Sequence, residues 1–157
     1  MTTPTIYIET TVIGHIAARQ QSDITVAARQ LASLTWWNRR HEFDLFVSQI
    51  VLDECRSGDS GAAIERIELV RGIAILDVTP QADDLAAALI SDYGIPATEP
   101  RDALHISIAA TNGIQYLLTW NFRHIANPST RNKIDFICRE CGFAPPIICS
   151  PDELMGT

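Results

Sequence analysis

Short apolar segments alternate with longer helical segments along the whole chain, and this alternation constrains the fold more than any other feature. The short segments are rich in β-branched and aromatic residues, as is typical of buried strands. They predict five strands, at residues 5–8, 45–47, 73–78, 116–119 and 147–149. Because helical segments separate these strands, we predict an α/β fold in which the strands form a parallel sheet.

Capping residues and prolines mark where several of the helices begin. Ser22 or Asp23 is placed to cap a long helix that ends near residue 40, and Ser48 precedes a short helix. Thr79 precedes a first-turn proline, and Ser129 is expected to cap the helix that ends at Gly142. The apolar face of the first long helix is predicted from residues at helical spacing: Val26, Leu31, Leu34 and Trp37.

The composition is typical of a soluble globular protein. The 157 residues, of which 46% are hydrophobic and 20% charged, are expected to form a single domain over residues 1–157. No apolar run approaches the roughly 20 residues needed to cross a bilayer, and the N-terminus lacks the basic region of a signal peptide. We therefore expect a cytoplasmic protein with no membrane partner.

The four cysteines are expected to be free thiols, as is usual in a reducing compartment. Cys138 and Cys141 have the spacing of a redox or zinc half-site. No second such pair or nearby histidine accompanies them, so buried positions on one helix face are the favoured interpretation.

The net charge of −7 is unlike that of a general nucleic-acid-binding protein, whose affinity comes largely from basic residues on phosphates. An enzyme that acts on nucleic acid through metal ions remains compatible with this charge, because its acidic residues form the site itself. Such an enzyme also needs local basic residues to hold its substrate.

Four polar residues are predicted to converge at one edge of the sheet. Glu9 ends the first strand, Asp102 begins the helix before the fourth strand, and Asn121 follows that strand. Glu54 lies nearly two turns into the helix that Ser48 caps. Ligands of open parallel sheets bind beyond the carboxyl ends of the strands. Three carboxylates and an amide oxygen at that edge predict a site for Mg²⁺ or Mn²⁺.

Several neighbouring residues have two interpretations. Thr10 and Thr11 could bind the Glu9 carboxylate or a phosphate, or could cap a helical turn. His105 follows Asp102 by one turn, and a structural histidine is favoured over a general base. The basic residues near the edge could hold RNA phosphates or be ordinary surface charges: Arg101, Arg123 and His124. The three tryptophans are interpreted as core or interface residues rather than base-stacking platforms: Trp36, Trp37 and Trp120.

Four segments resemble the PIN domains of VapC-type toxins: IYIETTVIGHIAAR, LFVSQIVLDEC, RDALHISIAATNGIQYLLTWNFRHIANP and PPIICSPDEL. The resemblance covers about Thr5 to Leu154, and its most specific parts are DALHIxxA and LLTWNxRHIAN. It implies a three-layer fold with a five-stranded parallel sheet flanked by helices, and a metal-dependent ribonuclease site of clustered acids. It also implies a homodimer and a small cognate antitoxin as partner.

The resemblance assigns the family's acidic positions to Glu9, Glu54 and Asp102 as metal ligands, with Asn121 as a fourth catalytic position. Two of these depart from the family pattern. Glu9 adds a methylene where relatives have Asp, and Asn121 lacks the charge that many relatives carry. These departures favour one well-held metal ion over two.

Three functions compete at this point. The leading hypothesis is a metal-dependent endoribonuclease that is the toxin of a toxin–antitoxin pair. A catalytically weakened PIN-fold protein that binds RNA or a protein partner is the alternative. A phosphatase or receiver-like domain would use an aspartyl nucleophile on the first strand, and Glu9 counts against it.

Overall fold

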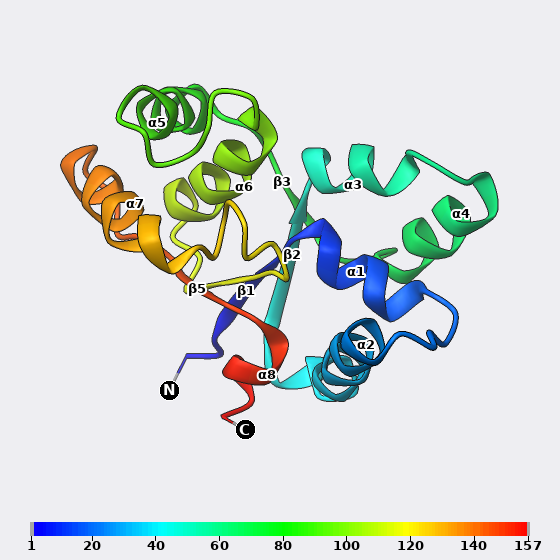
Figure 1. The fold of residues 1–157 in the computed structure, drawn as a ribbon. Coiled ribbons are helices and arrows are strands. Elements are labelled where there is room, and N and C mark those ends of the chain that lie inside the picture. The colour runs from blue at the N-terminus through cyan, green and yellow to red at the C-terminus, as the bar shows by residue number, and fades with distance from the viewer. Residues whose placement is uncertain (1, 157) are drawn as a thin grey trace.

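A five-stranded sheet with every strand parallel forms the centre of the molecule (Figure 1). The computed structural model describes residues 2–156. The strands, in the order β3-β2-β1-β4-β5, are β3 (Ala74–Leu76), β2 (Asp44–Ser48), β1 (Thr5–Ile8), β4 (Tyr116–Leu118) and β5 (Ile147–Cys149). The predicted parallel α/β sheet of five strands is therefore confirmed, with small differences at the strand ends.

Strand β1 occupies the middle of the sheet, between β2 and β4. It pairs with β2 from Thr5 opposite Asp44, and with β4 from Ile6 opposite Tyr116. The chain proceeds from β1 to β2 and β3 on one side, then crosses to β4 and β5 on the other. The strand order thus reverses between β1 and β4, which is where open parallel sheets place their ligands.

Helices cover both faces of the sheet, as Figure 1 shows. One layer contains α5 (Pro80–Ser91), α6 (Pro100–Thr111) and α7 (Pro128–Glu140). The other contains α1 (Thr10–Ala17), α2 (Ile24–Trp37), α3 (Gln49–Arg56) and α4 (Ser60–Leu69), and the short α8 (Pro151–Leu154) packs against α2. A 3-10 turn at Arg40–Glu42 leads into β2. Within residues 2–156, no helix has both the length and the apolarity needed to cross a membrane.

The core lies on both sides of β1, where Ile6, Tyr7 and Ile8 are completely buried. Helix α6 is the most deeply buried helix, and the residues from Asp102 to Ala110 are almost all inaccessible to solvent. An unbroken apolar strand and a helix that is buried on most of its faces fit a sheet covered on both sides. These two elements form a rigid support for the edge of the sheet.

Helix α1 was missed by the sequence prediction, which assigned no full helix after the first strand. Thr10, Thr11 and Gly14 are weak helix formers, so local propensity gives little indication of this helix. Tertiary packing stabilises it instead, because Val12, Ile13 and Ile16 are buried in the core. An element of eight residues depends on such burial, since isolated helices this short are marginal in water.

The predicted apolar face of α2 was wrong at Leu31 and Leu34, which are exposed, whereas Trp37 packs against the core. Leu31 is 67% exposed, and the buried residues of α2 are Gln30, Ser33 and Trp36. Two of these residues are polar, and each can be buried because it makes a tertiary hydrogen bond. The Gln30 amide donates to the carbonyl of Ala18 at 2.8 Å, and Ser33 Oγ accepts from an indole nitrogen of the core. Periodicity of apolar residues cannot detect a helix face that is buried through polar contacts.

Two smaller predictions were also wrong. Asn127, not Ser129, caps α7, because its side-chain oxygen accepts the backbone N–H of Ser129. Cys141 is exposed at the end of α7, whereas Cys138 is buried as expected. All four thiols are free, which confirms that prediction.

Candidate active site

Glu9 lies at the reversal point of the sheet, immediately after β1, and is only 3% exposed. Its Oε1 atom accepts hydrogen bonds from Thr119 Oγ1 at 2.6 Å and from Thr11 Oγ1. Thr11 Oγ1 in turn accepts the backbone N–H of Trp120 at 2.9 Å. The carboxylate is therefore fixed between the ends of β1 and β4, the two neighbouring strands.

Glu54 reaches the same edge from α3. Ser48 caps this helix, as predicted, because its hydroxyl accepts the backbone N–H of Val51. Glu54 Oε1 lies 2.7 Å from both Thr10 Oγ1 and His105 Nε2. The interaction with His105 joins α3 to α6 across the junction of the two helix layers.

His105 is completely buried and anchored on both ring nitrogens. Its Nδ1 lies 2.7 Å from the Tyr7 hydroxyl, which lies 2.7 Å from Ser48 Oγ. Tyr7 and Ser48 are also fully inaccessible to solvent. A continuous hydrogen-bonded chain therefore connects Ser48, Tyr7, His105 and Glu54, which makes His105 a buried, satisfied histidine as the sequence favoured.

Asp102 begins α6 in its first turn and makes a separate set of contacts. Its Oδ2 accepts a hydrogen bond from Asn121 Nδ2 at 3.2 Å and lies 3.2 Å from His124 Nδ1. Asn121 Oδ1 accepts the backbone N–H of His124 at 3.0 Å. Asn121 thus orients Asp102 and the loop after β4 together.

The four predicted residues form two adjacent groups rather than one. Ligand atoms of Glu9, Glu54 and His105 lie within 4.8 Å of one another, and so do those of Glu99, Asp102 and His124. Helix α6 supplies both Asp102 and His105, one turn apart, and so connects the groups.

Sequence reasoning missed Glu99, and it missed that the His105 and His124 rings lie within 4.8 Å of the acidic ligand atoms of their groups. Glu99 and His124 stand three residues from Asp102 and Asn121, respectively, which is the one local signal that could have indicated them. His105 was considered only as a structural residue or a general base.

The charges at the site influence one another strongly. Burial raises the pKa of Glu9, against the opposing effects of His105 and the two threonine hydroxyls. Burial also raises the pKa of Asp102, against its hydrogen bond from Asn121. Burial alone would do the same to Glu54, but the hydrogen bond and charge of His105 hold its pKa below the usual range.

His105 experiences the combined field of these acids. Burial opposes its protonation, but the hydrogen bond to Glu54 and the negative charges of the three carboxylates outweigh burial and raise its pKa. A protonated His105 would offset part of the negative charge that the acids concentrate at this edge.

The donor set fits a divalent cation. Carboxylate oxygens are the preferred ligands of Mg²⁺ and Mn²⁺. The side-chain hydrogen bonds to each acid reach a single oxygen: Glu9 Oε1, Glu54 Oε1 and Asp102 Oδ2. The second oxygen of Glu54 and of Asp102 lies outside these bonds, whereas the Glu9 carboxylate also accepts a backbone hydrogen bond from Thr11.

Comparison with known proteins identifies the family. The family model described as "PIN domain" matches residues 6–127 of the chain. This chain belongs to the PIN domain family. The match includes Glu9, Glu54, Asp102 and Asn121, so all four predicted site residues lie inside the PIN domain.

Solved structures share this PIN fold at low sequence identity. VapC20 of Mycobacterium tuberculosis, described as a toxin that cleaves the sarcin–ricin loop, is 16% identical with a TM-score of 0.58. The likeness covers 78% of this chain and 95% of VapC20. A chain of VapBC2 from Rickettsia felis, solved bound to a DNA fragment from its promoter, is 14% identical with a TM-score of 0.55. That likeness covers 93% of this chain and 98% of the other. No curated protein sequence matched this chain significantly.

Proposed function

We propose that this PIN domain protein is a metal-dependent endoribonuclease that hydrolyses phosphodiester bonds in RNA. The observation that supports this most directly is the arrangement of Glu9, Glu54 and Asp102 around buried His105. These acids come from three different elements and lie in two neighbouring groups that α6 connects, beside the reversal point of a parallel sheet, where ligands of such folds bind.

Glu9, Glu54 and Asp102 would hold Mg²⁺ or Mn²⁺, and the departures at Glu9 and Asn121 favour one tightly held ion. When bound, the ion would supply Lewis-acid stabilisation of the phosphate and lower the pKa of a bound water. The hydroxyls of Thr11 and Thr119 fix the direction of the Glu9 carboxylate. Asn121 orients Asp102 and, as the fourth catalytic position, would help to position the attacking water.

The biological role we propose is that of a toxin with a small cognate antitoxin. VapC20 is described as a toxin and VapBC2 as a complex on promoter DNA, and both share the fold of this chain. We further propose a homodimer in the cytoplasm. A neighbouring gene for a small DNA-binding protein, whose expression rescues growth arrest caused by this chain, would support the pairing.

The test of the activity is Asp102→Asn in the purified protein, assayed on single-stranded RNA with Mg²⁺ or Mn²⁺. Loss of a supporting contact to a metal ligand costs 10- to 100-fold, so loss of the ligand itself should lower cleavage by at least about 100-fold. EDTA should abolish wild-type cleavage. Asp53→Asn is the matched control, because Asp53 is an exposed acid of the same helix as Glu54 whose side chain contacts Gln49 and Arg56 and none of the predicted site residues.

The alternative, a weakened PIN domain that binds without cleaving, has one specific observation in its favour. Glu9 is buried, already accepts two hydroxyl donors, and has a raised pKa, all of which weaken it as a ligand. RNA binding without cleavage in either metal would favour this alternative. Cleavage that Asp102→Asn leaves unchanged would contradict the site assignment.

A further inference from the structure

Four side chains form an aromatic–arginine cluster beside the acids: His15, Arg29, Trp120 and Phe122. The Arg29 guanidinium carbon lies 5.2 Å from the centroid of the Phe122 ring and 5.5 Å from that of Trp120. The Trp120 ring meets Phe122 edge to face at 5.8 Å and His15 at 6.1 Å. The cluster thus joins α1 and α2 to the loop that follows β4.

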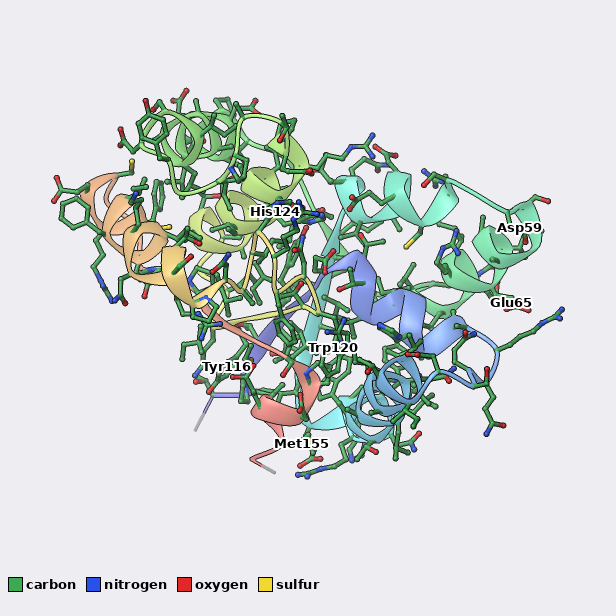
Figure 2. All side chains as sticks on the ribbon, viewed as in Figure 1. Asp59, Glu65, Tyr116, Trp120, His124 and Met155 are labelled. Atoms are coloured by element: carbon green, nitrogen blue, oxygen red, sulfur yellow. The ribbon has the colours of Figure 1, made fainter. Side chains whose placement is uncertain are left out.

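The cluster adjoins the candidate active site directly. Trp120 and Phe122 flank Asn121, which hydrogen bonds Asp102. The backbone N–H of Trp120 binds Thr11 Oγ1, and that hydroxyl donates to Glu9. Figure 2 labels Trp120 and His124, the residues that bracket this segment of the loop. A group held by the cluster would therefore lie beside the residues that contact Glu9 and Asp102.

The two aromatic rings differ in accessibility. Trp120 is 7% exposed, and its Nε1 donates to Ser33 Oγ at 2.8 Å, so it belongs to the core as the sequence indicated. Phe122 is 39% exposed, although it lies against Trp120 and Arg29. Phe122 therefore presents an apolar ring to solvent while its neighbours hold it in place.

Two arginines lie near Phe122, Arg29 against its ring and Arg123 next in the sequence, and neither is neutralised by an ion pair in the part of the chain that the structure describes. Within residues 2–156, neither Arg29 nor the exposed Arg123 has a carboxylate within salt-bridge distance. This is notable in a chain of net charge −7. Proteins bind unpaired nucleotides with aromatic rings that stack on the base. Guanidinium groups add contacts to a ring face and to the phosphate.

We propose that Phe122, supported by Arg29, is a stacking platform for one nucleobase of single-stranded RNA, with Arg123 placed to contact a phosphate beside it. This inference rests on the proposed ribonuclease function and adds a binding subsite to it. A base inside a duplex is already stacked on both faces, so the platform would favour single strands and loops over double helices.

The test measures binding of two probes to the non-cleaving Asp102→Asn protein in Mg²⁺: an adenosine 12-mer RNA and an abasic 12-mer with the same phosphates. Removal of one aromatic platform costs roughly 5- to 150-fold in affinity for a base-bearing strand. Phe122→Ala should show this loss for the adenosine 12-mer and leave the abasic affinity unchanged. Phe122→Trp should keep the affinity, which separates loss of the ring from loss of folding.

Phe136→Ala is the matched control, because Phe136 is 62% exposed on α7 and outside the cluster. It should leave both affinities unchanged. The proposal is overturned if the parent protein binds the two probes equally, or if Phe122→Ala weakens both probes alike or neither. Base-dependent binding through Phe122 in a wild-type protein that cleaves no RNA would contradict the proposed activity and leave this subsite standing.

Discussion

Tyr7→Phe removes one oxygen atom from the centre of the molecule and tests the hydrogen-bonded chain behind Glu54. The Tyr7 hydroxyl bonds both Ser48 Oγ and His105 Nδ1 at 2.7 Å, and all three residues are 0% exposed. Phenylalanine keeps the ring and its packing, so only these two hydrogen bonds are lost. Ser48 Oγ keeps its bond from the backbone of Val51, whereas His105 Nδ1 loses its partner.

A buried polar atom left without a partner costs about 1–3 kcal/mol. For a chain of this length, each kcal/mol lowers the melting temperature by about 2–4 °C, so Tyr7→Phe should melt roughly 2–12 °C lower than wild type. Urea unfolding should show the same loss in midpoint with an unchanged slope, because the surface exposed on unfolding is the same.

Tyr116→Phe is the matched control. Tyr116 lies on the neighbouring strand β4, and its hydroxyl makes no hydrogen bond within residues 2–156. This variant should stay within about 0.5 kcal/mol of wild type. The reasoning would be refuted if Tyr7→Phe were as stable as Tyr116→Phe, because the hydroxyl would then contribute nothing to the fold.

Two further predictions concern titration. In EDTA, the raised pKa of His105 means that its contribution to stability is complete below pH 6.5 and is lost as the pH rises through its folded pKa. The free energy of unfolding should therefore fall above pH 6.5, by at most about 1.4 kcal/mol per pH unit for one proton, and the melting temperature should fall with it. His105→Gln should flatten this dependence, and a melting temperature that rises with pH there would contradict the prediction. Among the thiols, Cys141 is exposed, whereas burial raises the pKa of Cys55 to about 11 and those of Cys138 and Cys149 to about 12. A thiol reagent should label one cysteine of the native protein and four after denaturation, and rapid labelling of more than one would contradict the burial.

The sheet and the edge that carries the acids follow from local patterns in the sequence. Short β-branched strands separated by helices require parallel pairing, and parallel pairing brings the carboxyl ends of β1 and β4 to one edge. Glu9 and Asn121 could therefore be assigned to that edge from their positions after those strands. Cap residues such as Asp23 and Ser48 act locally, so they too were predictable.

The division of the acids into two groups, and the contacts that support them, depend on packing between distant segments. His105 meets Tyr7 across 98 positions and Glu54 across 51, and contacts between residues so far apart leave no periodic signal in a sequence. The same holds for Arg29 over Phe122, which joins α2 to a loop near the other end of the chain. Helix α1 and the buried polar face of α2 could not be predicted from the sequence for the same reason. Packing and side-chain hydrogen bonds, not local propensity, stabilise them.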